Sequence, residues 1–337
     1  MKALLITFLL ISFSSFAQEG KLILNKAIHF ELATKNDTID FLVIDTILTE
    51  TKPIFLFCQG SQPVPLIIDF EDGSSFLFGG VSNFDVEKIK EDYHLVAISM
   101  PETPLRAKKS ELNQSYAYIT NPDDKNSYKE SYLKADYLEN YVNRATIVLS
   151  YLQKKSWVSK EQLVIAGHSQ GSKVAVKLAS ENKNVTHLGL FGFNAFGRIE
   201  QMLRQERKYA ETGVKTWGEA EEDIAYWEQL WKDANNEDSV KVNPNLIAWK
   251  SFSQPLINEL IRVEVPVYIC YGTEDMVATN CDILPLMFTS KGKDNLTLIR
   301  KHSLNHNFFE LAENGRADHK KPHWVEVMNE FVEWTKK

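Results

Sequence analysis

Short apolar runs alternate with stretches of helical periodicity along most of the chain. Residues 54–60 read IFLFCQG, a continuous apolar run ending in glycine, which predicts a strand buried on both faces. Similar runs at 94–101, 162–167 and 265–272 predict further buried strands. Because helical segments separate these runs, the pattern predicts an α/β fold with a mainly parallel sheet and helices on both faces.

Weaker patterns extend this organisation toward both ends of the chain. Residues 129–155 carry apolar residues in steps of three and four, which predicts one long helix with a single apolar stripe. The other strands are predicted at 21–25, 27–34, 38–46, 186–194 and 295–300, the last of them being the final strand. The other helices are predicted at 84–93, 171–182 and 323–337.

The region from about residue 195 to residue 262 interrupts the alternation of strands and helices. It is polar, helical and rich in aromatic residues, among them Trp217, Tyr226, Trp227, Trp231 and Trp249. It is too long for an ordinary crossover between strands. We therefore expect an inserted helical cap over the sheet edge, with most of the aromatic residues packed inside the cap.

Composition and charge exclude several function classes. The 337 residues are 44% hydrophobic and 25% charged, which is typical of a globular protein. The net charge of −7, without a basic run, argues against a nucleic-acid partner. Three cysteines cannot form a disulfide framework, although a bridge between Cys270 and Cys281 stays open, and no Cys or His spacing resembles a metal site.

The first 17 residues are expected to be a signal peptide. Lys2 precedes an apolar stretch, and residues 15–17 read Ser-Phe-Ala, so signal peptidase is expected to cut after Ala17. The apolar stretch is too short to span a bilayer, and no stable membrane anchor is expected. Residues 18–337 are therefore predicted to form an exported domain, either periplasmic or secreted.

Residues 167–171 read GHSQG, a G-x-S-x-G pattern between a predicted strand and a predicted helix. In that context a serine lies on a sharp turn that exposes its hydroxyl above the sheet, and glycines at both ends leave room for the bend. The pattern predicts that Ser169 is a nucleophile, whereas a glycine-flanked turn without chemistry is the alternative. His168 is expected to pack beside the turn rather than act as the base.

A serine nucleophile needs a base and a carboxylate that orients the base. Asp275 follows a predicted strand and is the expected acid, with Glu274 as the less favoured neighbour. His306 lies in the loop after the next predicted strand and is the expected base, with His302 as the alternative in the same loop. His323 is expected to be exposed at the start of a helix.

The fourth component is an oxyanion hole made of backbone N–H groups. The N–H of Gln170, directly after the nucleophile, is the first expected donor. The second is expected from Ser61, in a segment that reads CQGSQPVPL and follows a predicted strand. Taken alone, that segment is equally consistent with an ordinary Gly/Pro turn.

Four segments, FCQGSQPVP, GHSQG, YGTED and LNHNF, resemble the oxyanion loop, nucleophile turn, acid turn and histidine loop of the α/β-hydrolase superfamily. The resemblance covers nearly the whole chain after the signal peptide. It implies an α/β-hydrolase fold with an inserted helical cap and catalysis without a metal or organic cofactor. Two positions depart from many members: Gln59 stands where a histidine is common, and Ser172 where a second glycine is common.

The resemblance implies a serine hydrolase that cleaves a carboxylic ester through an acyl-enzyme, with a small molecule or a peptide as substrate. A peptide or amide ranks second and a thioester third. The competing class is a binding protein that keeps the fold without turnover, and the presence of all four site components argues against it. The sequence leaves the oligomeric state open.

Overall fold

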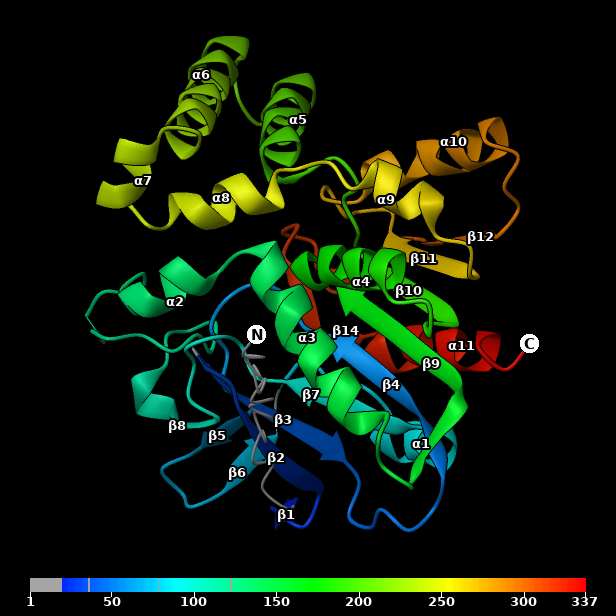
Figure 1. The fold of residues 1–337 in the computed structure, drawn as a ribbon. Helices are drawn as coiled ribbons and strands as arrows, with labels where there is room; N and C mark the ends of the chain where they lie inside the picture. Colours follow the sequence, from blue (N-terminus) through cyan, green and yellow to red (C-terminus); the bar gives the residue numbers. More distant parts are fainter. Residues whose placement is uncertain (1–19, 36, 78, 122) are drawn as a thin grey trace, which may run out of the picture.

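The computed structural model describes residues 20–337 except 36, 78 and 122, so the predicted signal peptide lies outside the described residues. Its centre is a nine-stranded sheet with the order β1-β2-β3-β7-β4-β9-β10-β11-β12 (Figure 1). The strands of this sheet are β1 (Lys21–Ile23), β2 (Ala27–Ala33), β3 (Thr38–Ile44), β4 (Lys52–Cys58), β7 (His94–Ile98), β9 (Val158–His168), β10 (His187–Phe191), β11 (Val267–Gly272) and β12 (Leu296–Lys301).

The sheet is parallel from β7 to β12 and antiparallel only at the edge formed by β1, β2 and β3. Its central strands are buried on both faces: Phe55 and Leu56, adjacent residues of β4, point to opposite faces and are both inaccessible to solvent. The predicted α/β class with a mainly parallel sheet is therefore confirmed.

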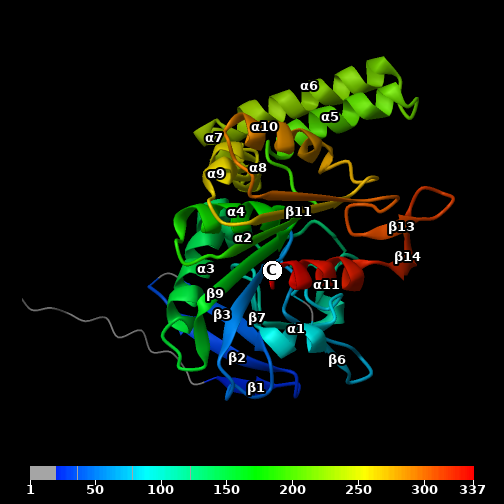
Figure 2. The same ribbon diagram turned by 90° about the vertical axis from the view of Figure 1, so that its right-hand side faces the viewer.

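Helices cover both faces of the sheet (Figures 1 and 2). One apolar core joins the sheet to the helices α3 and α4, and a second core on the opposite face joins it to α1 and α11. These helices are α1 (Val86–Asp92), α3 (Leu138–Leu152), α4 (Gln170–Glu181) and α11 (Trp324–Trp334). Among the described residues, no helix is long and apolar enough to cross a membrane.

The single long helix predicted over residues 129–155 is wrong. The chain forms α2 (Glu130–Ala135) and α3, and between them Asp136 and Tyr137 leave the helical conformation. The Asp136 carboxylate is buried and accepts hydrogen bonds from the hydroxyls of Tyr132 and Tyr141. The apolar periodicity continues across the break, but these two hydrogen bonds from neighbouring tyrosines hold Asp136 in a non-helical turn.

Five helices lie between β10 and β11, in the region where the sequence predicts an insertion. They are α5 (Arg198–Glu211), α6 (Trp217–Ala234), α7 (Glu237–Val242), α8 (Leu246–Phe252) and α9 (Ile257–Arg262). Helices α5 to α8 form a group above the ends of β4 and β9 (Figure 1). Trp227 packs against Trp249 inside this group, whereas Trp217 and Tyr226 are half exposed.

The remaining elements lie outside the main sheet. Residues 295–300 are not the final strand, because a short antiparallel pair follows β12 before α11 begins. These elements are β5 (Ile67–Asp69), β6 (Ser75–Leu77), β8 (Arg106–Lys108), β13 (Phe309–Leu311), β14 (Ala317–Pro322), α10 (Leu284–Ser290) and the 3-10 turns η1 (Lys109–Glu111) and η2 (Thr279–Ile283).

Candidate active site

Ser169 lies on the turn that joins β9 to α4. Its backbone has φ 55° and ψ −121°, a conformation that is strained for a residue with a side chain. A Cβ on Gly167 would overlap the carbonyl of Gly171, and a Cβ on Gly171 would overlap the carbonyl of Cys58 at the end of β4. Both glycines are therefore required by close backbone approach, and the serine lies at the strand-to-helix turn that the sequence predicts.

Ser172 takes the place of the second glycine that is common after this turn. Its hydroxyl is fully buried and lies within hydrogen-bond distance of the carbonyls of Gly167, at 2.7 Å, and Phe191, at 3.0 Å, either of which can accept its single proton. Phe191 lies in β10, and its carbonyl also accepts the N–H of Ser169 at 2.9 Å. The Ser172 side chain thus fastens the turn to the neighbouring strand.

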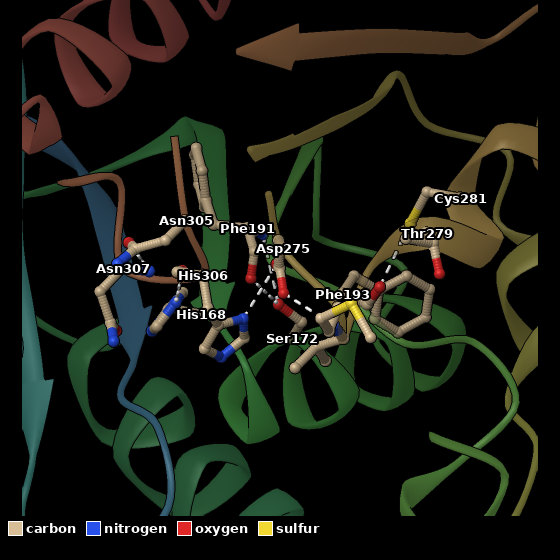
Figure 3. Close-up of polar contacts among 12 residues, drawn as sticks. His168, Ser172, Phe191, Phe193, Asp275, Thr279, Cys281, Asn305, His306 and Asn307 are labelled. Carbon is tan, nitrogen blue, oxygen red and sulfur yellow. Dashed lines mark hydrogen bonds and ion pairs between the residues drawn. The ribbon is translucent and has the colours of Figure 1, made fainter. Parts of the chain in front are cut away.

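Asp275 and His306 meet at the carboxyl ends of the neighbouring strands β11 and β12. The His306 Nδ1 atom lies 2.9 Å from the Asp275 Oδ2 atom (Figure 3). Asp275 is 1% exposed, and its other oxygen accepts the N–H of Val277 at 2.8 Å. A carboxylate only accepts, so Nδ1 carries the proton and Nε2 of His306 is left as the basic nitrogen.

The structure separates the expected residues from the alternatives. Glu274 is exposed beside Asp275, and His302 is exposed directly after the end of β12. Asn305 shapes the loop that brings His306 to Asp275, because its side-chain oxygen accepts the N–H groups of the residues two and four positions later. His323 precedes α11 and forms ion pairs with Glu310 and Glu326 at the surface.

A glycine makes room for the pair of Asp275 and His306. Gly192 follows β10 with φ 55°, in the left-handed region that favours glycine. A Cβ at this position would lie 2.9 Å from the His306 ring and 3.2 Å from the Asp275 Oδ2 atom. Any side chain there would push the imidazole away from its carboxylate.

His168 supports the histidine loop from the nucleophile turn. Its Nε2 atom lies 2.9 Å from the backbone carbonyl of His306, so Nε2 carries a proton, because a carbonyl can only accept. Burial, together with the nearby His306, lowers the pKa of His168 to about 3, so the ring is neutral at ordinary pH. The ring also packs edge-on against Trp324, with 5.0 Å between centroids.

The predicted oxyanion loop lies directly beside Ser169. A Cβ on Gly60 would be 3.8 Å from the Cβ of Ser169, and Ser61 lines the same cavity as the serine. The Gln59 side chain turns back and donates to the Ile98 carbonyl at 2.9 Å. Gln170 is the first residue of α4, where a backbone N–H has no acceptor within the helix.

A cavity of about 800 Å³ joins these groups to the helical insertion. Ser169, His306 and Ser61 line it together with Trp249 and Phe252 of α8. Sequence analysis missed the three charged residues in its wall, Asp136, Lys173 and Arg198. No local pattern marks them, because they come from a helix break, the second turn of α4 and the first residue of α5.

All three cysteines are free, so the Cys270–Cys281 bridge that the sequence left open does not form. Cys270 and Cys281 are buried, and the Cys281 thiol donates to the carbonyl of Phe193. Burial raises the pKa of Cys58 and of Cys270 to about 12. Among the described residues, no group of three His, Cys, Asp or Glu side chains is arranged to hold a metal ion.

The chain matches no family model, and its sequence matches no curated protein. Its structure is similar to uncomplexed acylaminoacyl peptidase from Pyrococcus horikoshii, with a TM-score of 0.55 and 12% identity over 92% of this chain and 41% of the peptidase. VinJ gives a TM-score of 0.50 and 12% identity over 90% of this chain and 98% of VinJ. The chain thus spans less than half of the peptidase.

Acetyl xylan esterase 1 from Thermoanaerobacterium sp. JW/SL YS485 gives a TM-score of 0.48 and 12% identity, over 95% of this chain and 88% of the esterase. At such identities the likeness concerns the fold. The matches to the peptidase and to VinJ, at TM-scores of 0.55 and 0.50, support a shared fold. The chain has the α/β-hydrolase fold.

Proposed function

We propose that the protein is a serine hydrolase that cleaves carboxylic esters through an acyl-enzyme. The observation that carries this proposal is the 2.9 Å contact between His306 Nδ1 and Asp275 Oδ2, beside a cavity that Ser169 also lines. A carboxylate that fixes the imidazole tautomer leaves Nε2 free to take a proton from a hydroxyl. The strained turn at Ser169 supports the same role, because it presents the hydroxyl at the end of the sheet.

In the proposed mechanism, Ser169 Oγ attacks the substrate carbonyl carbon while His306 Nε2 takes the hydroxyl proton. The N–H groups of Gln170 and Ser61 hydrogen-bond the oxyanion of the tetrahedral intermediate. When the intermediate collapses, His306 returns the proton to the departing alkoxide, and an ester of Ser169 remains. Water then attacks that ester with His306 again as base, which releases the acid and restores the serine.

An ester is the first substrate class because an alkoxide is a better leaving group than the amide anion that an unprotonated peptide nitrogen would form, so an ester depends less on protonation by His306. A peptide or amide is the second candidate, since acylaminoacyl peptidase has the same fold at a TM-score of 0.55.

We also propose export, on the signal-peptide pattern of residues 1–17. Pulse-chase labelling in the producing cell should show a precursor that is converted to a shorter form by cleavage after Ala17.

A fluorophosphonate probe tests the nucleophile, because it phosphonylates an activated serine. We expect the folded protein to be labelled and the Ser169→Ala variant not to be. Ser180→Ala is the matched control, since Ser180 lies on the same helix α4 and its hydroxyl only donates to the carbonyl of Lys177. An unlabelled wild-type protein with an intact fold would refute the nucleophile.

Substrate class is tested with matched p-nitrophenyl esters and aminoacyl p-nitroanilides of equal acyl length. We expect a higher kcat/KM for the esters, with both activities lost in Ser169→Ala. Higher kcat/KM for the anilides would make the protein a peptidase or amidase. Turnover of neither series, together with tight binding of the esters, would favour the binding protein.

A further inference from the structure

Three charged side chains line the cavity beside Ser169, and positive charges outnumber negative ones among them. Among the described residues of the wall, Lys173 and Arg198 are cations and Asp136 is the one carboxylate. Lys173 and Asp136 are buried, with 5% and 7% exposure. The wall therefore has an excess of one positive charge when all three groups are ionised. Such an excess in a poorly solvated cavity favours an anion.

Arg198 has few partners for its five N–H groups. Its guanidinium lies 5.3 Å from the ring centroids of both Trp249 and Phe252, which hold it by cation–π contact. Within the described chain, the acceptor of its hydrogen bond is the side-chain oxygen of Gln170, and no carboxylate forms an ion pair with it. Burial lowers the pKa of this guanidinium below its ordinary value, which reflects poor hydration.

Gln170 keeps the carboxylate of Asp136 apart from Arg198. The Gln170 side chain donates to Asp136 at 3.2 Å through Nε2 and accepts from Arg198 through Oε1. The Asp136 carboxylate is already held by the hydroxyls of Tyr132 and Tyr141. The Gln170 amide thus lies between the two charged groups. Asp136 therefore orients Arg198 without occupying the paired N–H donors of the guanidinium that fit a carboxylate.

Lys173 adds a second cation to the same wall. Its ammonium donates to the carbonyl of Gln254 at 2.9 Å, and burial together with Arg198 lowers its pKa to about 7. Because Lys173 is only partly protonated near pH 7, the wall carries at most one excess positive charge, which suits a singly charged ligand better than a dianion. This balance favours a carboxylate over a phosphate monoester.

We propose that Arg198 binds a carboxylate group of the substrate, which makes the protein a hydrolase of acidic esters. This inference rests on the proposed function of Ser169. Gln170 links the two sites: its backbone N–H is a proposed oxyanion donor, and its side chain contacts Arg198. Arg198 thus lies within reach of the side chain of the residue that carries the proposed oxyanion donor, which favours short dicarboxylate-like substrates.

The test compares esters that differ only in a carboxylate or a neutral carboxamide. One arm places the group on the acyl part, with p-nitrophenyl hydrogen glutarate against p-nitrophenyl glutaramate. The other arm places it on the alcohol part, with p-carboxyphenyl butyrate against p-carbamoylphenyl butyrate. We expect kcat/KM to favour the carboxylate in one arm by roughly 10- to 100-fold, as for a hydrogen bond to a charged group. That arm identifies the acidic part of the substrate.

Arg198→Met should bring the ratio of kcat/KM for the carboxylate ester to kcat/KM for the carboxamide ester close to one. Arg198→Lys should give an intermediate ratio, because lysine keeps the charge but lacks the paired N–H donors of the guanidinium. Arg207→Met is the matched control, since Arg207 lies on the same helix α5, is exposed and pairs with Glu211. A ratio near one in both arms of the wild type, or a preference that survives Arg198→Met, would overturn the inference.

Binding to the Ser169→Ala variant separates this inference from the proposed function. Isothermal titration of that variant with the two glutaryl esters needs no turnover. Tighter binding of the carboxylate, lost on adding Arg198→Met, supports the inference even if fluorophosphonate labelling fails. Equal binding of both esters contradicts the inference about Arg198. If the wild type still hydrolyses the glutaramate ester, the proposed serine hydrolase function is supported all the same. Circular dichroism and the Tm of each variant identify a loss of fold.

Discussion

The Nε2 atom of His168 donates a hydrogen bond of 2.9 Å to the backbone carbonyl of His306. The bond joins the residue before the proposed nucleophile to the proposed base, although 138 positions separate them in the chain. The two rings lie 4.8 Å apart between centroids. His168 is therefore a positioning residue for His306, and its pKa of about 3 makes its ring too weak a base to take a proton at ordinary pH.

Replacing His168 tests this positioning role. We expect His168→Ala to lower kcat about 10-fold or more, because a misplaced base loses proton-transfer efficiency. His168→Gln carries a neutral amide donor that can reach the same carbonyl, so it should recover most of kcat and keep the pH–rate profile. The measurement is kcat and KM as a function of pH. A Gln variant as impaired as the Ala variant would contradict the role.

Asp275→Asn should keep the fold and lower kcat by about 10⁴-fold, because an amide in this position favours the wrong imidazole tautomer. Glu274→Gln is the matched control: it alters the adjacent acid, which is exposed, and should retain wild-type kcat. Steady-state ester hydrolysis measures both. Loss of activity in Glu274→Gln, with activity kept in Asp275→Asn, would reassign the acid.

Gly171→Ala should destabilise the protein by about 3 kcal/mol or more, because the added methyl would overlap the Cys58 and Gln59 carbonyls and overpacking of this kind is costly. Gly218→Ala provides the control, since a Cβ there meets open space on α6. It should stay within about 1 kcal/mol of wild type. Urea unfolding measures both. Equal stability of the two variants would show that the close approach does not exist in solution.

Lys173 makes the stability depend on pH in a defined direction. Its pKa falls from 10.5 to about 7 on folding, so between these values the unfolded chain binds more protons than the folded one. Its contribution to the unfolding free energy therefore rises with pH from about 7 to 10.5 and is lost as pH falls. Lys173→Met should remove this slope, which is at most about 1.4 kcal/mol per pH unit.

The control is Lys177→Met, one turn further along α4, where an ion pair with Glu181 raises the pKa of the lysine. Over pH 7 to 9.5 that variant should keep the wild-type slope. The comparison uses the free energy of unfolding in urea at several pH values. Parallel curves for wild type and Lys173→Met would mean that the Lys173 ammonium is hydrated.

The three free cysteines give a prediction about disulfide formation. With Cys58, Cys270 and Cys281 free, Ellman's reagent should titrate three thiols after unfolding. The native protein should react slowly, because the thiolate is the reactive form and burial raises these pKa values. One thiol after unfolding, rising to three with reductant, would indicate a disulfide.

The sequence predicted the elements whose cause is local. The turn around Ser169 could be predicted because any Cβ at Gly167 or Gly171 would overlap the backbone. The turn therefore requires glycine at both positions, and these glycines are visible in the sequence. His306 was preferred over His302 on its place in the loop, and it is His306 that contacts Asp275. The roles of these residues remain proposals.

What the sequence could not predict depends on contacts between distant segments. The break at Asp136 leaves the apolar periodicity intact, and besides two neighbouring tyrosines its carboxylate is held by Gln170, 34 positions away in another helix. Lys173 has the appearance of a surface residue at helical spacing, yet it is buried against the carbonyl of Gln254 from the insertion. Neither partner is near in sequence.

The interruption between α2 and α3 has a consequence for how this scaffold can change over evolution. Ser169, Asp275 and His306 are attached to strand ends, where the sheet sets their spacing. The groups proposed to recognise the substrate come from a helix break and from α5 of the insertion. The proposed recognition groups and the proposed triad thus lie on different segments of the chain, so a substitution at Arg198 would change the proposed recognition of the substrate while the strand ends keep the geometry of Ser169, Asp275 and His306.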